Sequence, residues 1–312
     1  MTGGQDDAAE HISSSARPEP GIKYGVPFGQ YRDWPATNNS TLKHCNHSPA
    51  HMHEAMTGGQ KESTPAMRMG TLVHAGKFEP LLIPAAYVVL PDYHLDADNV
   101  TAKGLKPSNP RNTSYYREKV AQFEATNSGK EVISGQQYAD LLGVVSALEA
   151  HRGAATAFGS GGVAEVSFVW TDPDTGILCK GRADWWDAAR GIVSDLKKAD
   201  SGKPFKYVGR NMFYHQAAAF YIDGLRTLGH DVKESWLVAV ESKAPYAVQA
   251  APIDEESLNA GRARYKRALE AVRHGRMTGD WPGPDSPDRW HFEEHKEEPV
   301  DLVLPGGEVL TI

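Results

Sequence analysis

The sequence predicts a mixed α/β fold with an N-terminal helical elaboration, mainly because of the pattern in its second half. Three strand-like runs, rich in β-branched and aromatic residues, occupy residues 164–170, 177–187 and 191–199. A long helical pattern at 205–229 and another strand-like run at 234–241 follow them. Together with a preceding helix, this order is typical of one α/β domain built on a single sheet.

The connection between the second and third runs predicts a tight hairpin. If the loop AARG at 188–191 forms the turn, Asp187 faces Ile192 and Asp184 faces Asp195. Cross-strand partners have Cβ atoms about 5 Å apart. We therefore expect the two aspartates to lie close together.

The connection between the first two runs extends the pairing to a third strand. If TDPDTG at 171–176 is the loop, Trp170 faces Ile177 and Glu165 faces Arg182. Arg182 is two residues from Asp184, so Glu165 is expected on the same face of the sheet. A shift of one residue would place it on the other face.

Helical signals dominate the N-terminal part of the chain. Asn39-Ser40 predicts the start of one helix that runs through a His-rich segment. Thr64-Pro65 predicts the start of the next helix, because a capping hydroxyl precedes a proline at the first helical position. The run AAYVVL at 85–90 predicts a short strand.

Two later helices have clear boundaries. Ser134 followed by Gln137 is a capping-box pattern that begins a helix over 138–152. Residues 253–275 carry a strongly amphipathic pattern and predict the final helix. The proline-rich chain after residue 280 predicts irregular structure.

Composition divides the chain into a folded domain and two tails. Residues 1–30 are rich in Ser, Pro, Gly and acids and predict a disordered tail. We expect the domain to occupy 31–292 and a C-terminal tail to occupy 293–312.

Charge and cysteine content limit the possible functions. The net charge of −7 argues against a protein that coats nucleic acid through a generally basic surface, but not against an enzyme with a local DNA channel. The two cysteines, Cys45 and Cys179, cannot supply a four-cysteine iron–sulfur cluster or a disulfide framework. No apolar run reaches the roughly 18 residues of a membrane span, and the polar N-terminus is not a secretory signal. We therefore expect a cytoplasmic protein without membrane contact.

The paired strands bring several charged side chains together. Asp195 and Lys197 share a face, and Asp184 and Glu165 are expected on the same patch. Mg²⁺ prefers oxygen ligands, and phosphodiester hydrolysis needs both an activated water and stabilisation of negative charge. The alternative is a solvated strand face with ordinary ion pairs.

The same residues resemble a known signature. Asp184 followed by Asp195-Leu196-Lys197 resembles the D…(D/E)-x-K motif of the PD-(D/E)XK nuclease superfamily, with Ala183 in place of the proline. Further segments follow in the order of a RecE, or exonuclease VIII, type nuclease domain. These are NNSTLKHCNHSPAH, MRMGTLVHAGKFEP, GRADWW, DLKKA, YHQAAAFYIDGL and WPG, which together span roughly residues 37–290.

The resemblance implies a fold and a set of roles. The fold is an αβββαβ core with a central mixed sheet flanked by helices. His74, Asp184 and Asp195 would bind Mg²⁺ or Mn²⁺, with the backbone carbonyl of Leu196 as a further ligand. Glu165 would be the acidic residue of the first core strand, and Lys197 the catalytic lysine.

The helix after the signature departs from the family pattern. Gln and Tyr usually stand four residues apart there, on one helix face. Tyr221 fits, but Ala217 occupies the position four before it and the glutamine is Gln216. Either the helix turns slightly or the glutamine has another role, so Gln216 and Tyr221 are candidates for supporting roles.

Two further groups of residues have more than one interpretation. Lys198, Lys203, Lys206 and Arg210 follow the signature and are either DNA-phosphate contacts or a solvated helix start. Four histidines gather in residues 44–53, but their spacing fits no standard zinc pattern.

The predicted activity is Mg²⁺-dependent exonuclease action on linear double-stranded DNA. By resemblance, digestion would run 5′ to 3′, act at DNA ends, leave 3′ single strands for a single-strand annealing (RecT-like) protein, and involve a homo-oligomeric ring. The alternatives are a RecB-like nuclease of CRISPR adaptation, an endonuclease, or a DNA-end-binding protein with a relict site.

Overall fold

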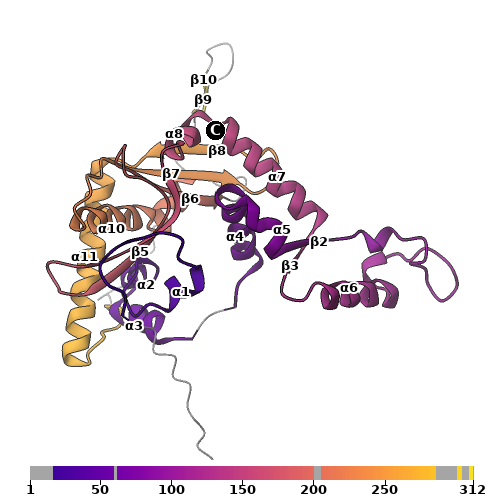
Figure 1. Ribbon diagram of the computed structural model, residues 1–312, viewed down its shortest axis with the longest axis horizontal. Coiled ribbons are helices and arrows are strands. Elements are labelled where there is room, and N and C mark those ends of the chain that lie inside the picture. The colour runs from indigo at the N-terminus through magenta and orange to yellow at the C-terminus, as the bar shows by residue number, and fades with distance from the viewer. Residues whose placement is uncertain (1–16, 60–61, 200–204, 286–300, 304–308, 312) are drawn as a thin grey trace, which may run out of the picture.

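A computed structural model describes residues 17–59, 62–199, 205–285, 301–303 and 309–311. Figure 1 shows a central sheet with α10 and α11 on one side and α4 and α7 on the other. This arrangement confirms the predicted α/β fold with a mixed sheet between helices. Within the described residues, no helix combines the length and apolar character needed to cross a bilayer.

The main sheet has six strands in the order β1-β4-β5-β6-β7-β8. The β6–β7 pair is parallel and the other neighbours are antiparallel, so the sheet is mixed. Its strands are β1 (Gly21–Lys23), β4 (Val163–Thr171), β5 (Leu178–Asp187), β6 (Ile192–Ala199), β7 (Glu234–Glu241) and β8 (Val248–Pro252). Two separate pairs are β2 (Tyr87–Leu90) with β3 (Glu131–Ser134), and β9 (Asp301–Val303) with β10 (Val309–Thr311).

Helices connect these strands and cover both faces of the sheet. The longer helices are α3 (Pro49–Thr57), α4 (Pro65–Phe78), α6 (Ser114–Thr126), α7 (Gly135–Ala150), α10 (Tyr214–Thr227) and α11 (Glu255–Thr278). The shorter ones are α1 (Phe28–Asp33), α2 (Asn39–Leu42), α5 (Ile83–Ala86), α8 (Arg152–Ala157) and α9 (Phe205–Asn211). Four 3₁₀ turns are η1 (Lys43–Asn46), η2 (Pro80–Leu82), η3 (Tyr93–Leu95) and η4 (Pro110–Asn112).

The caps expected for two helices are confirmed. The Thr64 side chain accepts a hydrogen bond from Met67 N–H at the start of α4. Ser134 and Gln137 form both bonds of the capping box at the start of α7. Each cap satisfies backbone donors that the first turn leaves without partners.

The predicted meander β4-β5-β6 is also confirmed, and the second hairpin has the expected register. Asp187 pairs with Ile192 and Trp185 with Ser194. The regular ladder then ends, just before the expected partners Asp184 and Asp195.

The predicted register of the first hairpin is wrong by two residues, since Trp170 pairs with Cys179 rather than Ile177. The Asp172 carboxylate accepts from the N–H and hydroxyl of Thr175, and Asp172 N–H donates to the Ile177 carbonyl. This Asx-type turn places the six-residue loop at 172–177, one position further along the chain than predicted, and so shifts the register by two residues. An even shift preserves the alternation of side chains, so Glu165 keeps its predicted face.

Each face of the sheet has its own apolar core. On one side, α10 and α11 pack with α2 and α3 against side chains of β4 and β5, including Phe168, Trp170 and Trp186. On the other, α4, α7 and α8 pack against Leu196 of β6 and Val238 of β7. The candidate site residues on β5 and β6 therefore lie between two buried layers.

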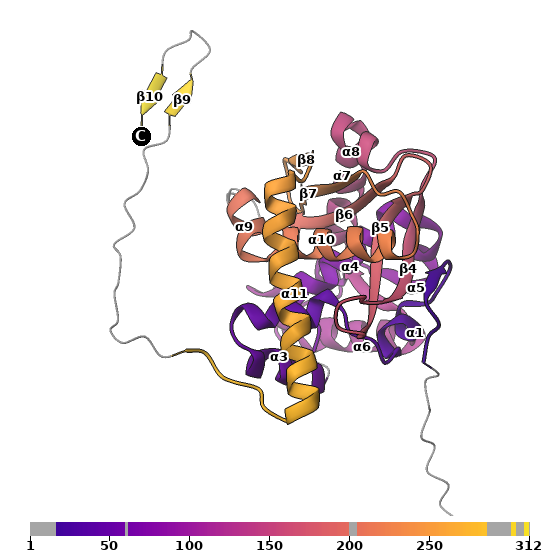
Figure 2. The ribbon, with the colours of Figure 1, turned by 90° about the vertical axis from the view of Figure 1, so that its left-hand side faces the viewer.

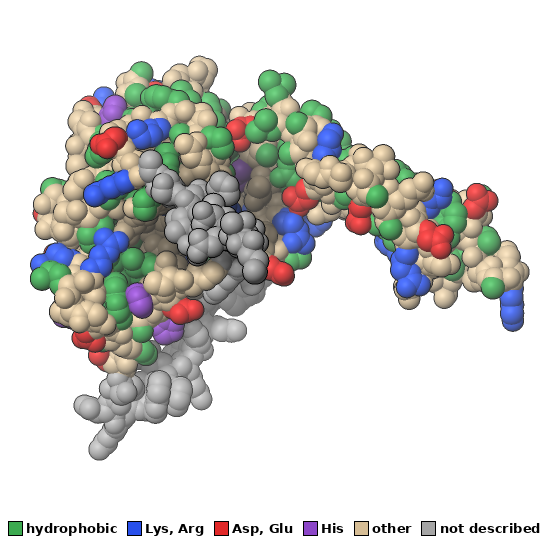
Figure 3. All heavy atoms as spheres, turned by 60° about the horizontal axis from the view of Figure 1, so that its bottom comes forward, with side chains coloured by type: hydrophobic (Ala, Val, Ile, Leu, Met, Phe, Trp, Pro, Cys, Tyr) green, Lys and Arg blue, Asp and Glu red, His purple; other side chains and the backbone are tan. Residues whose placement is uncertain are grey.

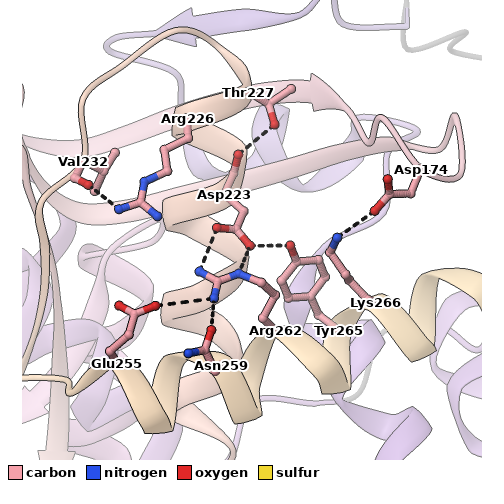
Figure 4. Close-up of polar contacts among 10 residues, drawn as sticks. All are labelled: Asp174, Asp223, Arg226, Thr227, Val232, Glu255, Asn259, Arg262, Tyr265 and Lys266. Atoms are coloured by element: carbon pink, nitrogen blue, oxygen red, sulfur yellow. Dashed lines mark hydrogen bonds and ion pairs between the residues drawn. The ribbon is translucent and has the colours of Figure 1, made fainter.

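A polar network fastens α11 to α10. The Asp223 carboxylate accepts from Arg262 Nε at 2.6 Å and from the Tyr265 hydroxyl at 2.6 Å (Figure 4). Lys266 Nζ reaches Asp174 of the β4–β5 loop at 2.7 Å. Figure 2 shows α11 crossing in front of α10 and running over nearly the whole height of the folded body.

Two predicted helices are divided in the structure. The helix expected over 205–229 is α9 and α10, which are separated at Phe213, a residue with a left-handed φ of 57°. The helix expected through the His-rich segment is α2, η1 and α3, with caps at Asn38 and Ser48 rather than at residues 39 and 40. Ser48-Pro49 begins a new helix because the cap hydroxyl and proline together favour that start.

Part of the predicted N-terminal tail belongs to the fold. Residues 1–16 lie outside the described part of the chain, but β1 pairs with β4 and α1 begins at Phe28. The buried Lys180 ammonium donates to the carbonyls of Tyr31, Arg32 and Trp34, which fixes the end of α1. Within the expected C-terminal tail, β9 and β10 form an antiparallel pair.

Residues 91–130 form an arm that projects from the body (Figures 1 and 3). The arm contains η3, η4 and α6 and is held by polar contacts of its own, such as Tyr115 to Asp96 at 2.8 Å. Figure 3 shows side chains of both charge signs along it. The sequence pattern did not predict α6.

Candidate metal centre

The site forms where β5 loses its regular pairing. The β4–β5 register passes over Glu165 and Asp184, and the β5–β6 register ends at Trp185. In place of a strand contact, the Asp184 carboxylate accepts a hydrogen bond from Leu196 N–H at 2.6 Å. The buried aspartate is thus held at a fixed place between the two strands.

Glu165 reaches this point through an unusual backbone conformation. Its φ is 54°, a left-handed value that is rare for a residue with a side chain and is typical of functional sites. Its carboxylate accepts from Arg182 Nε at 2.6 Å. The predicted Glu165–Arg182 contact therefore exists, although the backbone register differs.

His74 approaches from the opposite helical layer. It lies on α4, and its Nε2 donates to the Leu196 carbonyl at 2.9 Å, since a carbonyl can only accept. Its Nδ1 lies 3.5 Å from Asp184 Oδ1 and 3.8 Å from Glu165 Oε1. Leu196 thus contacts both Asp184 and His74 through its backbone.

His74, Glu165 and Asp184 form a group able to hold a metal ion. One ligand atom from each lies within 4.8 Å of the others. An imidazole nitrogen with carboxylate oxygens suits Mn²⁺ and, with retained waters, Mg²⁺. The residues present therefore fit the divalent cation that the sequence predicted.

The electrostatics of the group show how closely the charges are packed. Burial, supported by Asp195 and Glu165, raises the pKa of Asp184 to about 7 against the opposing effect of His74. Burial alone would lower the pKa of His74, but the nearby Asp184 and Glu165 carboxylates outweigh it and raise it to about 9. Burial likewise opposes ionisation of Glu165, yet contacts with His74 and Arg182 lower its pKa. Protons and Arg182 offset the charge of the acids in this group, and a cation would have to displace those protons.

Asp195 and Lys197 form a separate pair beside this group. Lys197 Nζ lies 2.5 Å from Asp195 Oδ2 and 3.4 Å from the Leu196 carbonyl. The pKa of Lys197 is raised because Asp195 and Asp184 outweigh the effect of burial. Asp195, predicted as a metal ligand, lies outside the group of three and contacts the lysine instead.

A small cavity of about 170 Å³ adjoins the pair. Asp195, Lys197 and the predicted Tyr221 line it, together with Tyr214 and Lys43. The Lys197 ammonium lies over the Tyr214 ring, 5.5 Å from its centroid. Tyr214 and Lys43 were not predicted as site residues. For Tyr214 the signal was its spacing of seven from Tyr221, which places both on one helix face.

Gln216 does not face this cavity. It is fully buried, its Nε2 donates to Asn39 Oδ1 at 3.1 Å, and its Oε1 accepts from Asn46 Nδ2 at 2.8 Å. Of the two readings left open by the sequence, the structure favours an altered role for this glutamine. Ala217, at the expected position, lines the cavity instead.

The predicted basic residues are spread over two places. Lys206 and Arg210 line a larger groove of about 560 Å³ that also includes Tyr214 and Arg264. Lys198 lies on β6, next to Lys197, and Lys203 lies outside the described residues.

The His-rich segment and the cysteines have structural contacts. His51 Nδ1 contacts Ser48 Oγ at 2.7 Å, and the His53 ring stacks on Trp281 with centroids 4.4 Å apart. Cys45 and Cys179 are both buried in the core beneath α10.

Fold and site together define a PD-(D/E)XK-type nuclease domain. The chain belongs to the family described as "PDDEXK-like domain of unknown function (DUF3799)", which its sequence matches over residues 38–286. No curated protein matches the sequence.

The chain resembles several solved structures, among them the following two. One, from Eubacterium rectale and described as "Putative exonuclease", has a TM-score of 0.51 at 12% identity and covers 84% of this chain and 91% of that chain. This identity shows a shared fold alone. The other, described as SSO0001, has a TM-score of 0.25 at 18% identity, covers 48% of this chain and 68% of that chain, and supports no argument.

Proposed function

We propose that the chain is a metal-dependent exodeoxyribonuclease that hydrolyses phosphodiester bonds of linear double-stranded DNA. The observation that carries this proposal is the group His74, Glu165 and Asp184, with ligand atoms within 4.8 Å, beside the Asp195–Lys197 pair. Membership of a PDDEXK-like family supports it.

The residues divide the chemistry among them. A bound Mg²⁺ or Mn²⁺ supplies an activated water and offsets charge on the scissile phosphate. Asp184, Glu165 and His74 hold that cation, with the Leu196 carbonyl beside them. The Lys197 ammonium orients the attacking water or stabilises the developing negative charge, and Asp195 fixes the ammonium in place. Tyr221 and Tyr214 form the wall beside Lys197.

The wider role follows from the resemblance of the sequence to RecE-type domains. We propose that the substrate is a DNA end, that digestion runs 5′ to 3′, and that the resulting 3′ single strand passes to a single-strand annealing (RecT-like) protein. A homo-oligomeric ring would keep the enzyme on its substrate. Lys206 and Arg210, in the groove that adjoins Tyr214, are candidates for phosphate contacts.

The direct test is digestion of linear duplex labelled separately at its 5′ and 3′ ends, with Mg²⁺, with Mn²⁺ and with neither. We expect release of the 5′ label first, and only with metal. A covalently closed circle serves as control and should stay intact. Cutting of the circle would favour an endonuclease, and loss of both hydrolysis and metal binding would favour a relict site.

Lys197→Ala should reduce metal-dependent hydrolysis about 100-fold or more, because removing one preorganised charge-stabilising donor typically costs that much. The fold should survive, since Lys197 is partly exposed at the cavity. Circular dichroism and Mn²⁺ binding would verify this. Undiminished activity would remove Lys197 from the proposed mechanism.

A further inference from the structure

Lys43 is a cation at the candidate centre that forms no ion pair with the residues the structure describes. It begins η1 and lines the same 170 Å³ cavity as Asp195 and Lys197. The structure gives its half-buried ammonium no hydrogen bond or ion pair within the described residues. Lys197, by contrast, is paired with Asp195 at 2.5 Å.

The charge that acts most on Lys43 is positive, because Asp195, the carboxylate in the same cavity, is paired with Lys197. Burial lowers the pKa of Lys43, and the nearby Lys197 ammonium lowers it further. A half-buried cation beside another cation is unfavourable unless an anion joins them. The cavity is thus built to receive negative charge.

We propose, on the basis of the nuclease function above, that Lys43 binds a phosphate oxygen of the DNA strand being cut, and that Gln216 positions the segment that carries Lys43. The phosphate keeps its charge throughout the reaction. The contact therefore acts mainly on substrate binding, whereas Lys197 acts on the chemical step.

The position of Lys43 is fixed from both sides. Leu42 and Cys45 of the same segment are buried in the core. The Gln216 amide bridges Asn39, before Lys43, and Asn46, after it. Arg264 of α11 also donates to Asn46 Oδ1 at 2.7 Å. This network explains why a buried glutamine that faces away from the cavity still belongs to the site.

The first experiment compares Lys43→Gln and Lys43→Arg with Lys266→Gln, a lysine whose partner is Asp174 in the β4–β5 loop. Steady-state hydrolysis of linear duplex gives KM and kcat, and anisotropy of a labelled oligonucleotide without metal gives Kd. Lys43→Gln should raise KM and Kd about 10- to 100-fold, as expected for loss of one charge-assisted hydrogen bond, and change kcat little. Lys43→Arg should retain part of the affinity, and Lys266→Gln should resemble the wild type.

The affinity for oligonucleotides with and without terminal phosphates shows which phosphate Lys43 binds. An equal loss of affinity with both assigns Lys43 to an internal diester, and a loss only with the terminal phosphate assigns it to the strand end. Unchanged KM and Kd in Lys43→Gln, or an equal effect of Lys266→Gln, would overturn the proposal.

Failure of the proposed function has a different signature. If the wild type hydrolyses no DNA with Mg²⁺ or Mn²⁺, the nuclease proposal fails, while the metal-free Kd still tests Lys43. If the wild type hydrolyses DNA and the Lys43 variants match it, only the Lys43 proposal fails.

Gln216→Met tests the positioning role, since it retains the side-chain volume and removes both amide contacts. KM should rise as in Lys43→Gln, and the double variant should raise KM no more than Lys43→Gln alone. Asn46→Ala, which removes one of the contacts, is the second variant if Gln216→Met does not fold. Additive effects on KM would overturn the positioning role.

Discussion

His74 and Asp184 lie in a buried group of charges that raises the pKa of both side chains. The pKa of His74 is raised to about 9 and that of Asp184 to about 7. Metal binding requires a neutral imidazole and an ionised carboxylate, so a cation must displace these protons. The centre therefore couples metal affinity to pH.

Apparent affinity for Mn²⁺ should rise as pH increases from about 6 to about 9 and become level above that. Each displaced proton changes the apparent affinity up to about tenfold per pH unit. Calorimetry in buffers of different ionisation enthalpy would measure both the affinity and the protons released. His74→Gln should weaken the pH dependence, and a Mn²⁺ affinity independent of pH in the wild type would contradict the proposed ligands.

At the residue scale, the sequence predicted the site residues that lie on paired strands, because their spacing fixes their relative positions. Asp184, Asp195 and Lys197 follow from hairpin counting, and His74 was placed by resemblance. Lys43 and the bridging role of Gln216 could not be predicted, because both depend on contacts between α10 and an N-terminal segment some 170 residues away.

At the element scale, alternation and caps were reliable guides and the positions of turns were not. The Asx-type bonding of Asp172 moved the β4–β5 register by two residues, and the left-handed Phe213 divided a helix. Neither feature changes hydrophobic periodicity, so the sequence pattern did not reveal them.

The contact between α10 and α11 depends on Gly261. A Cβ there would lie 2.2 Å from the His215 carbonyl oxygen and 2.9 Å from Gln216 N. Gly261→Ala must therefore push α11 away from α10, and we expect a loss of about 1–3 kcal/mol in the free energy of unfolding.

Urea denaturation would measure this loss. Gly70→Ala is the matched control, since a Cβ at this position of α4 meets nothing within 4 Å. Alanine there should be neutral or stabilise the helix by up to about 1 kcal/mol. Equal effects of the two substitutions would contradict the close approach of the helices.

At the scale of the molecule, the arm is separate from the hydrophobic core. No buried apolar residue lies between Tyr87 and Ile133, a fully described stretch. Three apolar side chains of the arm, Leu95, Val100 and Leu105, are exposed.

Replacing residues 92–129 with a Gly/Ser linker that spans about 10 Å should leave a folded protein that still binds Mn²⁺. Because β2 and β3 are parallel, the linker must run back along the pair from Leu90 to Glu131 and needs about a dozen residues. We expect the free energy of unfolding to change by less than about 1 kcal/mol. Loss of cooperative urea unfolding would show that the arm supports the core.

The whole chain carries a net charge of −7, so its proposed action on DNA depends on a local centre rather than on overall attraction. The rate of metal-dependent hydrolysis of linear duplex by Asp184→Asn tests that centre most directly. The variant can keep the Leu196 N–H contact while removing the carboxylate charge, so the fold should remain intact. We predict no hydrolysis above background with Mg²⁺ or Mn²⁺; a rate equal to that of the wild type would contradict the account.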